Sequence, residues 1–205
     1  MRIRNVLTAA VLAGASFTAS AGDLSYTWLE GGYVRSDRDA LGSGNGFGVR
    51  GSGAITDSLH FYGAYERSDQ DEVDLVHWRA GLGYNLEVND RVDLIGRVSY
   101  EGADYDFLGD GNGFGVEVGV RAALNPAFEA SAGVRYANLD LEDEVVCVAV
   151  VPTPPACQFV ADEDGGNTAF FVGGQYKFNP QWGVVAEASF SSHDNRLFVG
   201  PRISF

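Results

Sequence analysis

The chain has 205 residues, enough for one domain of ordinary size, and it carries 28 acidic but only 14 basic side chains. The resulting net charge of −14 excludes a nucleic-acid partner, because contacts with phosphate backbones need an excess of lysine and arginine. Glycine is abundant at 27 residues, and cysteine occurs only twice.

The first 21 residues differ from the rest of the chain. Arg2 and Arg4 precede an apolar stretch from about Val6 to Phe17, and Ala19-Ser20-Ala21 supplies the small residues that a signal peptidase accepts. We predict a cleaved secretory signal peptide over residues 1–21 rather than a membrane anchor, because the apolar stretch is too short to span a bilayer as a helix. Cleavage would leave 12 basic against 28 acidic residues in the mature part, 22–205.

Apolar and polar residues alternate with period two in segments of about ten residues, separated by turn formers. In the clearest segment, one face carries Phe114, Val116, Val118, Val120, Ala122 and Leu124, and the other carries Gly115, Glu117, Gly119, Arg121 and Ala123. We predict an all-β protein, an antiparallel up-and-down transmembrane barrel of ten strands in the outer membrane, with eight as the alternative count. The predicted strands are Leu24–Ser36, Phe47–Ile55, Leu59–Ser68, Asp74–Leu86, Arg91–Gly102, Gly113–Leu124, Phe128–Leu139, Thr168–Phe178, Trp182–Ser191 and Arg196–Phe205.

The connections between these strands alternate in length, as they do in membrane barrels. Four tight turns, predicted on the periplasmic side, are Thr56-Asp57-Ser58, Glu87-Val88-Asn89-Asp90, Asn125-Pro126-Ala127 and Asn179-Pro180-Gln181. The other five, mostly longer and acidic, are predicted outside the cell: Asp37–Gly46, Asp69–Val73, Ala103–Asn112, Asp140–Asn167 and Ser192–Asn195.

Outward aromatic residues gather at the two ends of the predicted strands, which is typical of the girdles that contact the membrane interfaces. One group contains Tyr33, Phe47, Tyr65, Tyr100, Phe114, Tyr136, Phe170 and Phe190, and the other contains Tyr84, Phe128, Phe178, Trp182 and Phe205. Outer-membrane lipid and lipopolysaccharide are therefore expected partners. The terminal Phe205, with outward Leu197, Val199 and Ile203, resembles the C-terminal signal that the barrel assembly machinery reads.

Most remaining charges fall on the inward faces, seven of each sign. The acids are Glu30, Glu66, Asp93, Glu101, Glu117, Glu129 and Glu187, and the bases are Arg50, Arg79, Arg97, Arg121, Arg135, Lys177 and Arg202. This balance favours an ion-pair network that fills a narrow lumen, while a selectivity lining for a pore is the alternative. Neutralising Arg79 or Arg121 is then expected to destabilise the barrel or to raise its leak.

One hexapeptide occurs twice, as Gly44-Asn45-Gly46-Phe47-Gly48-Val49 and as Gly111-Asn112-Gly113-Phe114-Gly115-Val116. A phosphate-binding loop would require a following helix, and neither copy precedes one, so we expect no cofactor. Tight re-entry of the chain into the sheet explains the glycines better.

Several short motifs match a known family: Leu24-Ser25-Tyr26, Leu29-Glu30-Gly31-Gly32-Tyr33-Val34, Trp78-Arg79-Ala80-Gly81-Leu82-Gly83-Tyr84-Asn85 and Val199-Gly200-Pro201-Arg202. The mature chain resembles the small porin-like outer-membrane proteins of xanthomonad-type bacteria, a likeness that implies associations with virulence, motility, biofilm and quorum-type regulation. It implies no catalytic residue. The sequence departs from the family at Asp140–Asn167, where the family loop is shorter and lacks cysteines.

Three functions remain open on sequence grounds. The favoured one is a non-enzymatic barrel that stabilises the outer membrane. The second is a surface protein that binds an extracellular partner through the loop 140–167, stiffened by a disulfide between Cys147 and Cys157. The third is a hydrolase at the outer rim, where His193, Asp194, Ser191, Asp69 and Asp71 lie in or beside outer connections, although such a short chain leaves little wall above the membrane for a cleft.

A calcium loop around Asp104, Asp106 and Asp110 is disfavoured, since Gly115 occupies the position of the late bidentate glutamate, and no specific metal site is expected.

Overall fold

The computed structural model describes residues 24–38, 42–70, 73–105, 109–141, 145–148, 156–159, 166–192 and 194–205. The predicted signal peptide lies outside these residues and stays a prediction. Within the described residues, no helix has the length and apolar character needed to cross a membrane.

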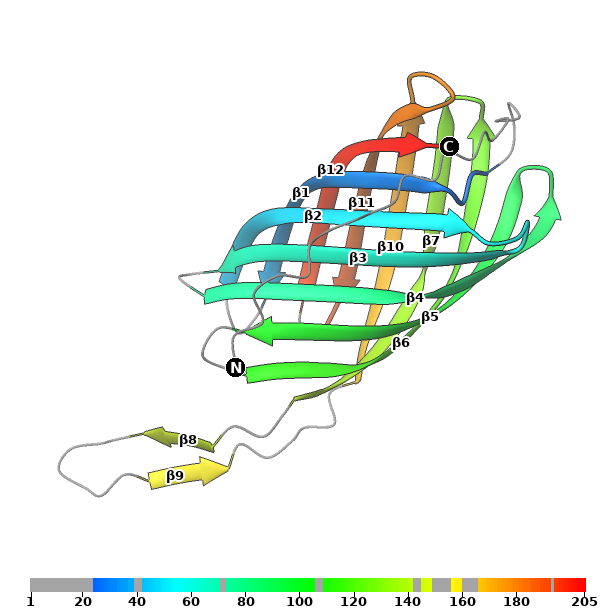
Figure 1. Cartoon of the computed structure of the whole chain (residues 1–205). Helices are drawn as coiled ribbons and strands as arrows, with labels where there is room; N and C mark the ends of the chain where they lie inside the picture. Colours follow the sequence, from blue (N-terminus) through cyan, green and yellow to red (C-terminus); the bar gives the residue numbers. More distant parts are fainter. Residues whose placement is uncertain are drawn as a thin grey trace, which may run out of the picture.

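Ten antiparallel strands close into one barrel, as predicted, and two further strands, β8 and β9, form a separate hairpin (Figure 1). Around the barrel the strands follow the order β1, β12, β11, β10, β7, β6, β5, β4, β3 and β2. Their bounds are β1 Trp28–Arg38, β2 Gly42–Ala54, β3 Leu59–Gln70, β4 Val73–Asn89, β5 Val92–Tyr105, β6 Gly109–Asn125, β7 Phe128–Leu141, β10 Gly166–Lys177, β11 Trp182–Ser191 and β12 Asp194–Ser204. The hairpin consists of β8 Val145–Val148 and β9 Ala156–Phe159.

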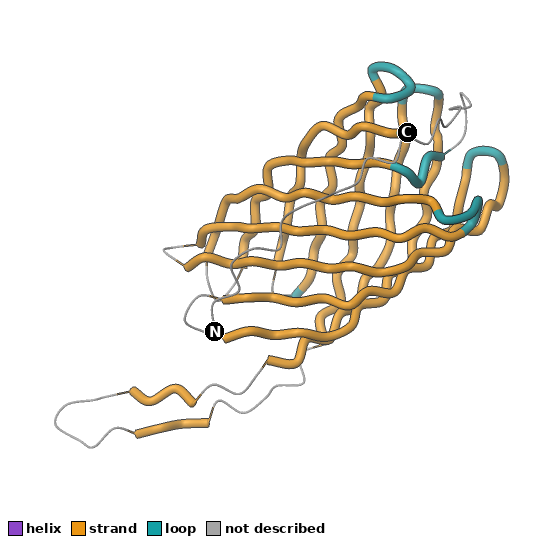
Figure 2. The backbone as a smooth tube through the Cα atoms, in the orientation of Figure 1, coloured by secondary structure: helices purple, strands orange, loops and turns teal. Residues whose placement is uncertain are grey.

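The four predicted tight turns all lie at one end of the barrel, which we call the turn end (Figure 2). Asn125 and Asn179 each accept two backbone N–H hydrogen bonds within their turns, at 2.8–3.0 Å, which is the reason asparagine favours these positions. The barrel also closes here, because the backbone N–H of Phe205 donates to the carbonyl oxygen of Thr27 at 2.9 Å. Short turns of outer-membrane barrels face the periplasm, so the opposite end, the loop end, faces outward.

The polarity of the barrel is inverted relative to a soluble protein. Phe114 and Val118 on the outer surface are 69% and 63% exposed, whereas Glu117 and Arg121 on the same strand are 6% and 7% exposed. Such a wall places apolar side chains toward lipid and polar side chains toward the lumen.

The outer girdle near the loop end is continuous across several strands. Trp78 lies 5.7 Å from Tyr100 between ring centroids, and Tyr100 lies 5.3 Å from Phe114. All thirteen aromatic residues predicted to face outward are exposed, and Trp78 joins them although the sequence patterning did not select it.

Two expected outer loops are shorter than predicted. The segments Asp37–Gly46 and Ala103–Asn112 were expected to be loops, yet β1 continues to Arg38, β2 begins at Gly42, β5 continues to Tyr105 and β6 begins at Gly109. The added residues of β2 pair with β1 and β3, and those of β6 pair with β5 and β7. This pairing on both sides outweighs the low strand propensity of glycine. The wall therefore extends beyond the girdle, contrary to the expectation of little wall there.

The hexapeptide repeats lie inside β2 and β6, so the prediction of tight re-entry for their glycines is wrong. A Cβ added at Gly46 would collide with the carbonyl oxygen of Arg67, and one at Gly113 with that of Asn138. Close approach of the neighbouring strand thus requires glycine. In both copies the asparagine accepts a hydrogen bond from a girdle tyrosine: Asn45 from Tyr33, and Asn112 from Tyr100 at 2.8 Å.

The predicted first strand began at Leu24, but β1 begins at Trp28. The preceding residues turn into the lumen at the turn end. There the ring of Tyr26 stacks on His60 at 4.7 Å, and its hydroxyl donates to Asp93 at 2.7 Å. These buried contacts outweigh continued strand pairing for residues 24–27.

Candidate functional site

The candidate site is the charged interior of the barrel. Side chains alternate between the two faces of a strand, so every second residue points into the barrel. All thirteen charged residues proposed for the lumen network are buried or half-buried. Five glutamates are the most enclosed, with exposed fractions of 1–6%: Glu30, Glu66, Glu101, Glu117 and Glu129. Asp93, the remaining predicted inward acid, is also buried.

Two rows of three charges lie on opposite walls. On β12, β1 and β2, Arg202, Glu30 and Arg50 are register partners, with Arg202 Nε 2.7 Å from one Glu30 oxygen and Arg50 3.8 Å from the other. On β5, β6 and β7, Arg97, Glu117 and Arg135 repeat the arrangement at 2.9 and 3.2 Å. Because β1 and β6 are five places apart in a ring of ten strands, the two rows face each other across the lumen.

Two further glutamates are also shared by two cations. Glu66 accepts from Arg50 at 3.0 Å and from Arg196 at 2.9 Å. Glu129 pairs with Arg121 and with Lys177. Arg196 was missing from the residues predicted for the lumen. It lies six residues before Arg202 on β12 and therefore on the same face of the strand, which could have identified it.

Inward aromatic rings support four of the arginines. The guanidinium carbon of Arg50 lies 4.0 Å from the ring centroid of Phe198, and that of Arg202 lies 4.2 Å from the centroid of Trp28. Arg97 and Arg121 lie in the same way over Tyr62 and Tyr26, at 5.0 and 5.3 Å. The sequence analysis missed these aromatic residues, because it assigned aromatic side chains to the outside. Each of these aromatic residues lies an even number of residues from an inward charged residue of the same predicted strand, and this alternation could have identified them.

Two histidines also lie inside. His77 Nε2 is 3.3 Å from Glu101, whose other oxygen accepts from the Ser99 hydroxyl at 2.7 Å. His60 is fully buried and accepts from Arg97 Nε at 3.3 Å.

Arg79 differs from the other predicted lumen cations. Among the described residues, no carboxylate lies within 4.0 Å of its guanidinium, and its Nε is buried without a hydrogen-bond partner. Glu101 is its register partner on β5 but bonds to His77 and Ser99 instead. The expectation that neutralising Arg79 or Arg121 destabilises the barrel or raises its leak stays a prediction, and of the two residues Arg121 has a direct ion pair, with Glu129.

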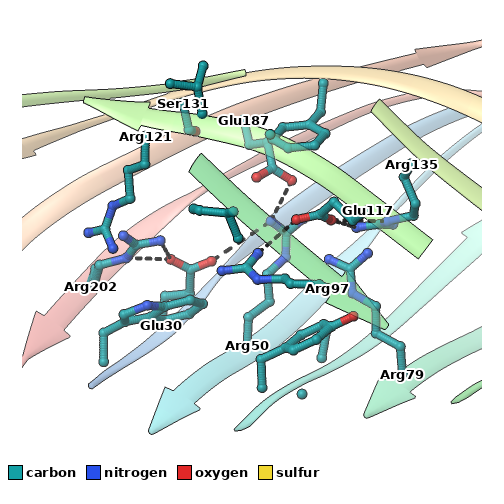
Figure 3. A pocket seen from close by; sticks show the side chains of 18 residues that line it. Glu30, Arg50, Arg79, Arg97, Glu117, Arg121, Ser131, Arg135, Glu187 and Arg202 are labelled. Atoms are coloured by element: carbon teal, nitrogen blue, oxygen red, sulfur yellow. Dashed lines mark hydrogen bonds and ion pairs between the residues drawn. The ribbon is translucent and has the colours of Figure 1, made fainter. Parts of the chain in front are cut away.

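A cavity of about 80 Å³ lies between the two rows at mid-height in the lumen. Figure 3 shows the side chains of Arg79, Arg97 and Arg135 approaching it from one side and those of Glu30 and Arg202 from another. The site is thus a small polar chamber enclosed by ion pairs.

The residues considered for hydrolysis do not form a catalytic group in the part of the chain that is described. Asp194 pairs with Arg38 and Arg196, and its backbone N–H donates to the Ser191 hydroxyl oxygen at 2.9 Å. Asp69 lies on β3, three strands from β12 around the wall. His193 and Asp71 lie outside the described residues, as does Asp106 of the calcium alternative. The described residues contain no cluster of three or more metal-ligating side chains.

The fourth outer connection contains a short hairpin. β8 and β9 pair antiparallel, with Cys147 opposite Cys157 in the register. The two side chains lie outside the described part of the structure, so the disulfide stays a prediction. In Figure 1 the hairpin is separate from the barrel wall, at the loop end.

Comparison with known proteins decides the family. Residues 6–150 match the outer membrane protein beta-barrel domain. The chain belongs to this family. Its location is therefore the outer membrane, and its barrel is that of a small outer-membrane protein. No curated protein matches the sequence.

Solved structures that are similar to this chain include a KdgM porin, OprG from Pseudomonas aeruginosa and Ail from Yersinia pestis. Their sequence identities to this chain are 11%, 11% and 12%, and the TM-scores are 0.43, 0.45 and 0.39. The alignments cover 87%, 90% and 88% of this chain and 99%, 98% and 99% of the three neighbours. The family assignment rests on the domain match.

Proposed function

We propose that this protein is a non-enzymatic outer-membrane barrel whose lumen is held closed by buried ion pairs. The observation that carries the proposal is the sharing of four glutamates, Glu30, Glu66, Glu117 and Glu129, between two cations each. These bonds cross between strands at several heights, and Arg50 alone joins carboxylates from β1, β3 and β11.

Closure follows from the cost of opening such a network. Removing one partner of a buried ion pair costs about 3–5 kcal/mol, so solutes cannot displace these side chains at little cost. The inward aromatic rings fill further space, and residues 24–27 occupy the turn end of the lumen. A ten-stranded barrel is also narrow, since barrel diameter grows with strand number.

A swelling assay with proteoliposomes tests this function. Liposomes that contain the protein should swell in small sugars no faster than empty liposomes, whereas liposomes with a general porin should swell rapidly. Swelling at the rate of the general porin would overturn the proposal.

The outer surface supports membrane partners for this function. The girdle residues would contact lipid and the sugar–phosphate region of lipopolysaccharide, and acidic side chains near the loop end would share divalent cations with its phosphates. Phe205, 46% exposed on the outer wall, would be presented to the assembly machinery. Replacing Phe205 with Ala should slow barrel assembly without changing the stability of the assembled form by more than about 1 kcal/mol.

A second candidate function is partner binding through the loop 140–167. The antiparallel pairing of β8 and β9 supports it, because a hairpin beyond the wall offers strand edges for contact. Opposed residues in such a pair have Cα atoms about 4.5–5.5 Å apart, within the range that a disulfide needs, which supports the bond between Cys147 and Cys157. The biofilm and virulence associations of the resembling family belong with this candidate.

Deleting residues 143–164 tests the second candidate. Cells that display the intact protein should attach to surfaces or aggregate more than cells that display the deletion, at equal amounts of heat-modifiable barrel. Equal attachment would remove this function and leave the first one intact.

A further inference from the structure

The wall of the central cavity is strongly cationic, although the whole chain carries a net charge of −14. Three glutamates line it: Glu30, Glu117 and Glu187. Six arginines line it: Arg50, Arg79, Arg97, Arg121, Arg135 and Arg202.

Neighbouring acids cancel most of this excess, but not all of it. Glu66 and Glu129 pair with Arg50 and Arg121 from outside the cavity wall, but each of them is also shared by another cation, Arg196 or Lys177. When these four residues and the buried acids Asp93 and Glu101 are included, seven carboxylates face eight cations, so an excess of one positive charge remains.

The excess is most localised at Arg79. Its neighbours Arg97 and Arg135 share the single carboxylate of Glu117, and Glu101 is held by His77 and Ser99. Among the described residues, no aromatic ring supports Arg79 in the way that Tyr62 supports Arg97, and the Nε donor of Arg79 is buried without an acceptor. Buried donors without a partner are rare in proteins and indicate a missing acceptor.

A small oxyanion would supply that acceptor and the missing negative charge. Uncompensated cations in a poorly hydrated interior are costly, and guanidinium groups bind oxyanions through paired N–H donors. A cavity of about 80 Å³ has room for a group of this size but not for a lipid or an oligosaccharide. Arg79, Arg97 and Arg135 are among the side chains that line the cavity (Figure 3).

We propose that the lumen holds a binding site for one small oxyanion of the phosphate or sulfate class, formed by Arg79 with Arg97 and Arg135. The bound anion acts as the counter-ion of the central arginines and is part of the packed interior. The site goes beyond the closed-barrel function and does not require it, since an anion could occupy the cavity whether or not the lumen conducts.

Anion-dependent stability tests the site in protein purified from outer membranes in detergent. Sodium sulfate and sodium phosphate are titrated at constant ionic strength, balanced with sodium chloride, while the temperature of barrel unfolding is followed by heat-modifiability. A ligand that binds only the folded state should raise this temperature almost in proportion to its concentration below the Kd and with the logarithm of its concentration above it. Titration calorimetry should give one anion per barrel.

Arg79→Gln should weaken sulfate binding by about tenfold or more, because it removes a charged donor without breaking an existing ion pair. Arg91→Gln is the matched control, since Arg91 is exposed in a tight turn, and it should bind sulfate as the wild type does. Arg79→Lys keeps the positive charge but lacks the paired N–H donors of the guanidinium, so it should bind sulfate with intermediate affinity. This variant replaces Arg79→Gln in the test if Arg79→Gln does not fold.

Two results would overturn the anion site: a wild-type unfolding temperature that responds to sulfate no more than to chloride, or equal sulfate binding by the wild type and the Arg79 variants. Channel conductance separates this outcome from failure of the closed-barrel proposal, because an open pore with specific sulfate binding contradicts only the latter.

Discussion

Replacing Glu117 with Gln removes the shared carboxylate of one charge row while preserving side-chain shape. Glu117 is 6% exposed and lies 2.9 Å from Arg97 and 3.2 Å from Arg135. The substitution leaves two guanidinium groups facing each other with a neutral amide between them. The barrel should therefore lose stability through uncompensated charge rather than through a cavity.

The magnitude follows from the burial of the three groups. Breaking a fully buried pair costs about 3–5 kcal/mol. The side chains of Arg97 and Arg135 remain 17% and 21% exposed, so partial hydration reduces the expected loss to about 2–4 kcal/mol. Equilibrium unfolding in urea, followed by tryptophan fluorescence and heat-modifiability, measures this loss.

Two companion variants make the reasoning refutable. Glu87→Gln, at an exposed position on β4, should change the free energy of unfolding by less than about 0.5 kcal/mol. The triple variant Arg97→Met, Glu117→Leu and Arg135→Met should fall within about 1 kcal/mol of the wild type, because an apolar replacement removes the desolvation cost together with the attraction. If Glu117→Gln is as stable as Glu87→Gln, the row does not stabilise the barrel and the reasoning fails.

Three further predictions concern other parts of the chain. Arg121→Gln leaves Glu129 with one cation and removes the 2.7 Å bond to the Ser25 carbonyl oxygen, so amide exchange at residues 24–27 should accelerate; unchanged exchange would show that Arg121 does not anchor this segment. Reduction of the predicted disulfide between Cys147 and Cys157 should expose the fourth outer loop to protease while the heat-modifiable barrel persists; unfolding of the barrel would place these cysteines in the wall. Asp69 and Asp74 share a hydrogen bond on the extracellular rim beyond the girdle. This hydrogen bond and the negative charge of Asp74 raise the pKa of Asp69. The same hydrogen bond, together with a hydrogen bond from Arg67 and its positive charge, lowers the pKa of Asp74. Asp69 therefore stabilises the rim at low pH and loses this effect as pH rises through its raised pKa, whereas Asp74 stabilises the rim at higher pH and loses this effect as pH falls through its lowered pKa. NMR titration of the carboxyl carbons should give a raised pKa for Asp69 and a lowered pKa for Asp74. Equal pKa values for the two carboxyl groups would contradict the pairing.

The inward and outward sides of the strands were predictable because lipid and a polar lumen demand opposite chemistry at alternate positions. Glu117 and Phe114 could be assigned to opposite faces from parity and polarity alone. The tight turns were predictable for a similarly local reason, since Asn125 and Asn179 bond to their own backbone.

The ion-pair partners were not predictable, because they depend on the stagger between strands. Glu117 meets Arg97 and Arg135 only through the registers of β5, β6 and β7, which no local pattern encodes. Trp28 and Phe198 were missed for a different reason, since an aromatic ring suits the lipid face as well as it suits a guanidinium in the lumen. The extended rim of β2 and β6 was missed because neighbouring strands, not glycine propensity, determine where those strands begin.

Single-channel recording in a planar bilayer tests the closed lumen most directly. The wild-type protein should show conductance far below that of a general porin, and Glu117→Gln should raise its leak, because two repelling arginines no longer bridge β5, β6 and β7. A wild-type conductance as large as that of a general porin would contradict the account, whatever the stability of the variants.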